Sequence, residues 1–394
     1  MLAKKVLVII VLVTLVLSCV GSDHSGNVKQ SVLSGDQQTE IYFPKLKNKK
    51  VGILVNQTSV INQTHLLDTL LRADINVVSI FVPEHGFRGT EDAGSIIDDS
   101  VDAKTGIPII SLHGQNRKPQ SKDLQGLDVI VFDLQDVGVR FYTYISTLHL
   151  LMEACGENNV SVMVLDRPNP NGDYIDGPVL DTKFSSFVGM DPIPVVYGMT
   201  IGEMAMMING EGWLKDSVKC DLEVIKINGY NRHKHYTLDI KPSPNLPNDI
   251  AVRLYPSLCF FEATEMSIGR GTEFPFQVIG YPDSKFGNFE FTPVSIKGMS
   301  MNPKHKNELC YGIDLRDSAI DIKFTLSYLI NFYNGWDEEK PFFESPVWLN
   351  LLAGTDQLLN QIKSGMTEEM IRKSWEPELL KFKGLRMRYL LYDD

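Results

Sequence analysis

Cysteine is scarce in this chain of 394 residues, and no two of its five cysteines have the C-x-x-C spacing. Zinc sites built from cysteine pairs are therefore not expected. After Cys19, the remaining cysteines lie at positions 155, 220, 259 and 310. In an exported protein these four could form two disulfides, but spacing does not select among the three pairings, and packed thiols are the alternative.

Positively charged residues are also fewer than negatively charged ones. The chain has 38 lysines and arginines and 49 aspartates and glutamates, and its formal net charge is −11. An acidic chain is a poor partner for nucleic acid. No G-x-G-x-x-G follows the first predicted strand and no H-E-x-x-H occurs, so we predict neither a dinucleotide cofactor nor a metal. A divalent ion held by His85, His113, Asp133 and Asp136 is the alternative to that prediction.

The chain begins with an apolar run that is too short to span a bilayer. Lys4 and Lys5 precede the run Val6–Leu17, whereas a spanning helix needs roughly 20 residues. A basic start with a short apolar core is typical of a secretory signal. The run ends in "VLSC", which is similar to the lipobox of bacterial lipoproteins, where the cysteine is lipidated. A signal peptide with an incidental cysteine is the alternative.

We therefore predict an exported bacterial lipoprotein, periplasmic or anchored to the outer membrane through lipid on Cys19. Residues 1–19 would be the signal peptide and lipobox. Residues 20–42 contain few apolar side chains and are predicted to be a flexible tether.

In the first half of the chain, apolar runs alternate with helix-like segments, and each apolar run ends in a polar cluster. Continuous apolar runs predict strands that are covered on both faces. Their alternation with helices predicts a doubly wound, mostly parallel α/β sheet over residues 43–245. Because parallel strands end at one edge, the polar clusters should converge there. These clusters contain Asn56, Glu84, His85, His113, Asp133, Asp136, Asp166, Arg167 and Asn169.

The second half has a different pattern. The proline-rich stretch 241–257 is predicted to be a passage between domains. Shorter mixed segments and C-terminal helices follow it. We interpret residues 246–394 as a smaller α+β domain that closes over the first.

Six motifs along the chain carry a resemblance to a known family. They are "PEHGFRG", "FDLQDVGVRFYTYIS", "LDRPNPNG", "PIPVVYGMTIGEMA", "PSPNLP" and "FEATEMSIGRGTEFPF". Together they resemble the exo-β-N-acetylmuramidase family of peptidoglycan hydrolases. The resemblance implies removal of terminal β-1,4-linked N-acetylmuramic acid from the non-reducing ends of peptidoglycan fragments. It also implies a Rossmann-like domain, a smaller C-terminal domain, an active site in the cleft between them, and no metal.

The resemblance also implies catalytic residues. The deep-cleft catalytic glutamate of the family falls on Glu84. A second, mobile glutamate of the family has no secure place, and Glu91, Glu265 and Glu273 are its candidates. Glycoside cleavage normally needs a carboxylic acid to protonate the leaving oxygen, and a desolvated glutamate is suited to that task. Retaining, inverting and substrate-assisted routes all stay open.

The lactyl carboxylate of muramic acid calls for an arginine, whose planar fork matches a carboxylate. We expect at least one of Arg88, Arg140, Arg167 and Arg270 to bind it, although an arginine is often part of a surface ion pair. Tyr142, with Phe141 and Tyr144, could stack on a sugar or pack in the core. The full predicted substrate-binding set is His85, Arg88, His113, Asp133, Asp136, Arg140, Tyr142, Asp166, Arg167, Asn169 and Arg270.

Two alternatives to the muramidase hypothesis remain. The first is a non-catalytic lipoprotein that binds muropeptides in the same cleft. The second is a hydrolase that acts on another amino sugar or on the peptide stem.

Overall fold

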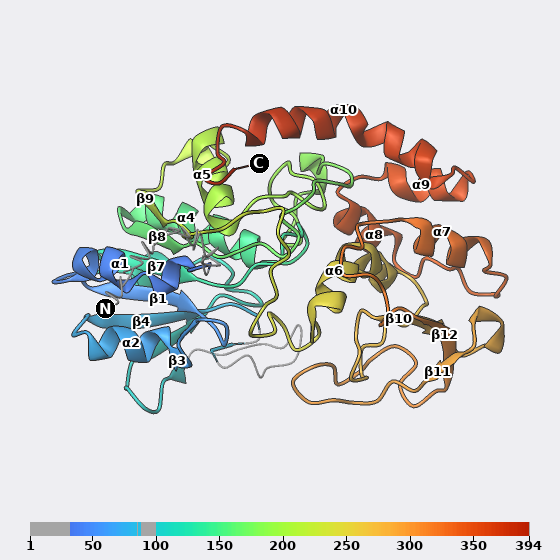
Figure 1. The fold of residues 1–394 in the computed structure, drawn as a ribbon, viewed down its shortest axis with the longest axis horizontal. Helices are drawn as coiled ribbons and strands as arrows, with labels where there is room; N and C mark the ends of the chain where they lie inside the picture. The colour runs from blue at the N-terminus through green and yellow to red at the C-terminus, as the bar shows by residue number, and fades with distance from the viewer. Residues whose placement is uncertain (1–31, 85, 88–99, 394) are drawn as a thin grey trace, which may run out of the picture. The chain divides into compact units, whose positions relative to one another are not determined.

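A mixed seven-stranded sheet forms the centre of the first half of the chain (Figure 1). The computed structural model describes residues 32–84, 86–87 and 100–393. The strand order is β5-β6-β4-β1-β7-β8-β9, and all neighbours are parallel except β5 and β6. The strands are β1 (Val51–Val55), β4 (Val77–Val82), β5 (Ser100–Val101), β6 (Pro108–Ser111), β7 (Val129–Asp133), β8 (Ser161–Leu165) and β9 (Leu222–Ile225).

Helices cover both faces of this sheet, because neighbouring strand residues point to opposite sides. Leu54, for example, packs in the core beneath α4 and α5, whereas Ile53 packs in the core beneath α1 and α2. The apolar runs are therefore buried on both sides, and the predicted doubly wound α/β sheet is confirmed. The helices of this half are α1 (Thr39–Leu46), α2 (Leu66–Arg72), α3 (Ser121–Leu124), α4 (Tyr144–Asn158) and α5 (Ile201–Glu211), and a small hairpin joins β2 (Val60–Ile61) to β3 (Thr64–His65).

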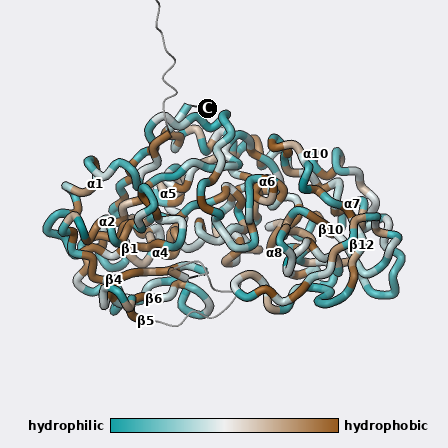
Figure 2. Tube along the Cα trace, turned by 60° about the horizontal axis from the view of Figure 1, so that its bottom comes forward, coloured by the Kyte–Doolittle hydropathy of each residue, from teal (hydrophilic) through white to brown (hydrophobic). Residues whose placement is uncertain are grey.

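The second half builds a smaller unit of helices around a three-stranded antiparallel sheet, as predicted. The sheet order is β10-β12-β11. The elements are α6 (Asp249–Leu258), β10 (Val278–Tyr281), β11 (Phe289–Phe291), β12 (Cys310–Asp314), α7 (Ser327–Asn334), α8 (Pro346–Ala353), α9 (Gln357–Lys363) and α10 (Glu368–Arg386). Hydrophobic residues concentrate along the strands of the large sheet, and hydrophilic segments form much of the outer loops (Figure 2).

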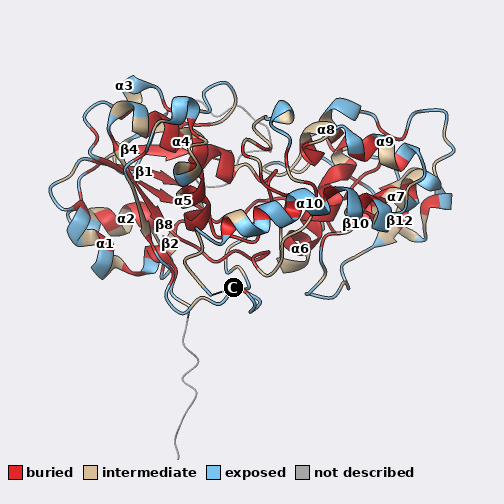
Figure 3. Ribbon diagram, turned by 90° about the horizontal axis from the view of Figure 1, so that it is seen from above, coloured by how far each residue is buried: buried red, intermediate tan, exposed pale blue. Residues whose placement is uncertain are grey.

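The C-terminal segment after α10 returns to the large sheet, so the two halves share one core. Tyr392 donates a hydrogen bond to Asp166 at 2.6 Å, and the main-chain N–H of Leu391 donates to Glu203 at 2.8 Å. The C-terminus accordingly lies beside α5 (Figure 1). Seen from above, α10 crosses the molecule with both buried and exposed residues (Figure 3).

The structure differs from the expectations drawn from the sequence in three places. Strand β9 and the short edge strand β5 were not predicted. The proline-rich stretch 241–257 contains most of α6, with Pro256 inside the helix. The predicted tether ends earlier than residue 42, because residues 33–42 pack on the domain and Asp36 and Tyr42 are buried.

None of the helices within the described residues is long and apolar enough to cross a membrane.

Candidate functional site

The carboxyl edge of the large sheet carries two cavities that matter for function. The chain runs from β1 to β4 and β6 on one side and then returns to β7, β8 and β9 on the other. In open α/β sheets, ligands bind outside the strand ends where the order reverses in this way. Both cavities are lined by segments that follow these strands.

The first cavity, called here the glutamate cavity, has a volume of about 80 Å³. It joins the segment after β4 and the start of α4 to the 243–246 segment, α6 and the loop before β10. Its lining residues are Glu84, Phe141, Tyr142, Thr143, Tyr144, Ser243, Asn245, Leu246, Tyr255, Arg270 and Phe276. Residues from four of the six sequence motifs therefore meet in one place.

Two tyrosines of the glutamate cavity are held in fixed orientations. Tyr144 accepts a hydrogen bond from Asn56 Nδ2 at 2.8 Å, and Tyr142 donates to the carbonyl oxygen of Pro242 at 2.8 Å. Burial, with a smaller contribution from the nearby Glu84 charge, raises the pKa of Tyr144. Tyr144 therefore stays a protonated donor at neutral pH.

The glutamate cavity contains one acidic and one basic side chain among its described lining residues. Glu84 is half-buried and carries the one carboxyl group. Arg270 lies over the ring of Phe276 at 4.9 Å, and its Nε donates to Glu262 at 2.8 Å. One carboxyl and one guanidinium thus share a cavity with five aromatic residues.

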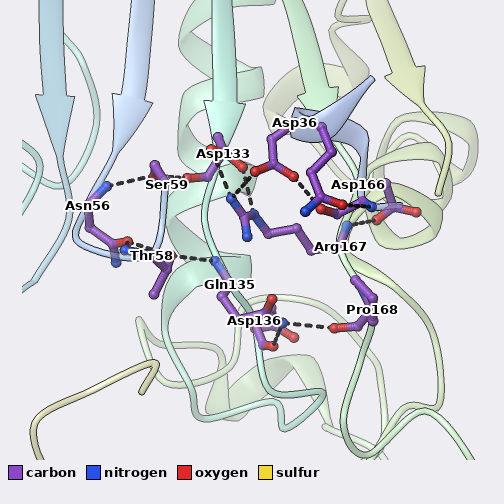
Figure 4. Close-up of polar contacts among 12 residues, drawn as sticks. Asp36, Asn56, Thr58, Ser59, Asp133, Gln135, Asp136, Asp166, Arg167 and Pro168 are labelled. Atoms are coloured by element: carbon purple, nitrogen blue, oxygen red, sulfur yellow. Dashed lines mark hydrogen bonds and ion pairs between the residues drawn. The ribbon is translucent and has the colours of Figure 1, made fainter. Parts of the chain in front are cut away.

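A buried ion-pair network lies at the ends of β7 and β8 (Figure 4). Arg167 Nε donates to Asp133 Oδ1 at 2.6 Å, and its Nη2 donates to Asp133 Oδ2 and to Asp36 Oδ2, both at 3.0 Å. Burial raises the pKa of Asp133 to about 6, while the Arg167 charge opposes that shift. The network ties the N-terminal segment to two strand ends.

The second cavity, called here the crevice pocket, has a volume of about 420 Å³ and lies against this network. Its lining residues are Ser34, Asp36, Gln37, Thr58, Val60, Asn62, Gln63, Gln135, Arg167, Tyr236, Leu238, Asp239 and Ile240.

Three of the predicted site residues, Glu84, Tyr142 and Arg270, are brought together in the glutamate cavity. Arg167 lines the crevice pocket instead. His113 follows β6 and is half-buried, but it lines neither cavity. His85, Arg88, Glu91 and Cys19 lie outside the described residues.

Arg140, a predicted substrate-binding residue, is fully buried and lines neither cavity. Its guanidinium donates to three main-chain carbonyl oxygens, those of Pro178, Ile193 and Leu352. Burial without a carboxylate partner lowers its pKa to about 9. Arg140 therefore joins the first half of the chain to the end of α8.

Four other predicted substrate-binding residues are buried, bond to protein donors or acceptors and line neither cavity: Asp133, Asp136, Asp166 and Asn169. Asp136 accepts from Tyr197 and from the main chain of Gly138. Asn169 Nδ2 donates to the carbonyl oxygen of Met199 at 2.7 Å. These side chains shape the loops that surround the cavities.

Neither candidate for the second glutamate that the structure describes reaches the glutamate cavity. Glu265 lies 3.9 Å from Lys340, and Glu273 is exposed. Three residues that line or support the two cavities were not predicted from the sequence: Asp36, Glu262 and Tyr255. Tyr255 could have been found, because a helix after "PSPNLP" would carry it towards the cavity.

The four described cysteines, Cys155, Cys220, Cys259 and Cys310, are free and buried. Burial raises the pKa of Cys220 to about 12. Within the ranges that the structure describes, no three histidine, cysteine, aspartate or glutamate side chains are grouped to hold a metal ion.

Comparison with known proteins identifies the family. Two family models match, described as "Exo-beta-N-acetylmuramidase NamZ, N-terminal" over residues 51–250 and "Exo-beta-N-acetylmuramidase NamZ, C-terminal" over residues 253–392. The chain belongs to the NamZ exo-β-N-acetylmuramidase family. The resemblance inferred from the six motifs is confirmed.

Relatives of this NamZ family chain cover almost its whole length. The peptidoglycan β-N-acetylmuramidase NamZ of Bacillus subtilis (strain 168) is 37% identical over 372 residues, which is 89% of each protein. Two crystal structures of DUF1343 family proteins from Bacteroides fragilis NCTC 9343 are similar. One has 46% identity and a TM-score of 0.85, and the other 28% and 0.79; each alignment covers 92% of this chain and 99% of the other.

Proposed function

We propose that this chain is an exo-acting β-N-acetylmuramidase in which Glu84 is the general acid. The NamZ family relationship makes it a glycoside hydrolase that acts on peptidoglycan. Cleavage of a glycosidic bond needs a proton for the leaving oxygen, because the transition state resembles an oxocarbenium ion. The proposal assigns that proton to Glu84.

One observation supports the assignment above others. Glu84 is the one carboxyl group among the described residues that line the glutamate cavity, and five aromatic residues line the cavity with it. A carboxyl group in this position can give a proton to the leaving oxygen of a sugar bound there.

The description of the matching family models, exo-β-N-acetylmuramidase, supports exo-action. The enzyme would therefore act on fragments with a free non-reducing muramic terminus and act slowly, if at all, on intact wall.

Arg270 is the arginine proposed to bind the lactyl carboxylate. Of the three predicted arginines that the structure describes, it alone lines the glutamate cavity. Its Nε and Nη2 both donate to Glu262, and no hydrogen bond of Nη1 is found within the described residues. The Glu262 pair would hold the guanidinium so that Nη1 meets the ligand.

The experiment that tests the function compares two disaccharides of N-acetylmuramic acid and N-acetylglucosamine, joined β-1,4 in the two possible orders. Val32–Asp394 forms one compact unit, so the protein without residues 1–31 can be used. We expect free N-acetylmuramic acid only from the disaccharide with muramic acid at the non-reducing end. Cleavage of neither, with binding retained, would support the alternative of a muropeptide-binding protein.

We also propose that the protein is exported and anchored to a membrane through lipid on Cys19. The motif "VLSC" after a basic start and a short apolar run supports this proposal.

A further inference from the structure

The crevice pocket lies where many doubly wound proteins bind a ligand, at the reversal of strand order beside β1. Here the N-terminal segment enters that crevice, since Asp36 accepts a hydrogen bond from Arg167 and the main-chain N–H of Gly35 donates to the main-chain carbonyl oxygen of Asp166 at 2.7 Å. A cavity of about 420 Å³ remains. This volume lies within the roughly 300–1,000 Å³ that small-molecule sites have.

Arg167 offers a fixed donor to this pocket. The residue is only 9% exposed, and two aspartates hold its Nε and Nη2. Within the described chain, no hydrogen bond is found for Nη1, although the side chain lines the pocket. Figure 4 shows the guanidinium above the loop that carries Gln135. Such a nitrogen can donate to an acceptor on a ligand in the pocket.

Gln135 offers a fixed acceptor to the same pocket. It is 5% exposed, and its Nε2 donates to the carbonyl oxygens of Asp136 and Pro168, both at 2.8 Å. These two bonds set the orientation of the amide, so its oxygen is left without a donor among the described residues. The pocket thus presents one anchored donor and one anchored acceptor.

The charge of the pocket favours a neutral ligand. Asp36 and Asp133 already compensate Arg167, and Asp239 adds a further exposed carboxylate at the rim. A phosphate or carboxylate ligand would meet three carboxylates and one guanidinium. Hydroxyl and amide groups, in contrast, can both accept from Arg167 and donate to Gln135.

The rim is made of side chains that suit a sugar. Asn62 and Gln63 form the tip of the β2–β3 hairpin with φ of 47° and 67°, and the half-buried Tyr236 also lines the pocket. A left-handed conformation costs Gln63 energy, and strained residues of this kind cluster at ligand sites. Planar amides with an aromatic ring offer hydrogen bonds and a stacking face together.

One main-chain oxygen links segments beside the crevice pocket and the glutamate cavity. Gln57, next to Thr58 of the crevice pocket, donates to the carbonyl oxygen of Pro242 at 3.1 Å. The same oxygen accepts from Tyr142 of the glutamate cavity.

We propose that the crevice pocket is an accessory saccharide subsite that binds an uncharged N-acetylhexosamine unit of the fragment beyond the cleaved bond. This inference rests on the proposed function, since it takes the scissile bond to lie at Glu84. The 2-acetamido group would accept from Arg167 and donate to Gln135.

A direct binding experiment tests the inference without requiring turnover. The probe is the β-1,4-linked disaccharide of N-acetylglucosamine, titrated into the wild-type chain and observed by ligand NMR. We expect saturable binding that weakens about fivefold or more in Tyr236→Ala and in Gln135→Met, as loss of one or two ligand contacts predicts. Gln361→Ala, which lines a separate cavity, is the control and should bind as the wild type does.

Equal affinity in all four proteins, or no saturable binding, would overturn the subsite. The Tyr236 variant is expected to fold, because no hydrogen bond of that side chain is found in the described structure.

A kinetic experiment separates this inference from the proposed function. The ratio of kcat/KM for a longer fragment to kcat/KM for a 4-nitrophenyl muraminide should fall in both variants. Absence of wild-type turnover on both substrates would contradict the function, and the binding data would still decide the subsite.

Discussion

At the scale of single residues, the arginines show what a sequence can and cannot tell. Three arginines lie in sequence motifs that look alike, but their burial and contacts differ: Arg140, Arg167 and Arg270. Arg140 bonds to carbonyl oxygens, Arg167 holds two aspartates, and Arg270 lines a cavity. The chemistry of a guanidinium was predictable. Its surroundings depend on segments far away in the chain and were not.

Arg270→Met should weaken binding of N-acetylmuramic acid as a product inhibitor. Loss of a charged hydrogen bond costs about 1.5–3 kcal/mol, so the inhibition constant should rise about tenfold or more. The inhibition constant of the derivative with an amidated lactyl group should rise less. Arg316→Met, which removes an exposed arginine paired with Asp314, is the control. An equal rise of the inhibition constant for both ligands would show that Arg270 does not bind the lactyl carboxylate.

At the scale of elements, the convergence of polar clusters at the strand ends was predicted correctly for β7 and β8. At the start of α5 a capping box forms, in which the main-chain N–H of Thr200 donates to Glu203 at 2.9 Å. Strand β9 was not predicted because it is short and mostly half-buried, which leaves no apolar run. Helix α6 was not predicted because prolines before it and inside it are also typical of a linker.

Asp166 joins three elements and should make stability depend on pH. It accepts from Thr200 at the start of α5 and from Tyr392 in the C-terminal segment. Burial raises its pKa to about 7, donors oppose that shift, and the neighbouring Glu203 adds to it. The folded state therefore retains a proton that the unfolded chain releases at lower pH. Its contribution to stability is complete below the unfolded pKa near 4 and is lost as pH rises through about 7.

Asp166→Asn removes this titration while it keeps the shape of the side chain. The unfolding free energy of the wild type minus that of the variant should therefore fall between pH 5 and pH 8. Urea denaturation at several pH values measures it. A difference that stays constant, or that grows with pH, would contradict the raised pKa.

At the scale of the whole molecule, the motif order gave the two-part architecture, but contacts between distant segments complete it. Asp36 lies 131 residues from Arg167 along the chain, and their ion pair folds a stretch that composition predicted to be a tether. The return of the C-terminal segment to Asp166 was equally invisible to local patterns. In both cases the two residues are far apart in the sequence and come into contact only in the folded chain.

The proposed membrane attachment is also tested on the whole molecule. In a bacterial host, the chain should incorporate labelled fatty acid and fractionate with membranes. Cys19→Ala should abolish the label and release exported protein in soluble form, because the proposal places the anchor on this one residue. Labelling of the variant at the wild-type level would rule out Cys19 as the lipid site.

The central claim is that Glu84 donates the proton to the leaving sugar, and Glu84→Gln tests it most directly. Turnover and binding of the disaccharide with non-reducing N-acetylmuramic acid should be measured on the same protein. We predict that kcat falls by about 10²- to 10⁴-fold, the usual contribution of a general acid, while Kd changes little. A variant that retains wild-type kcat would contradict the account.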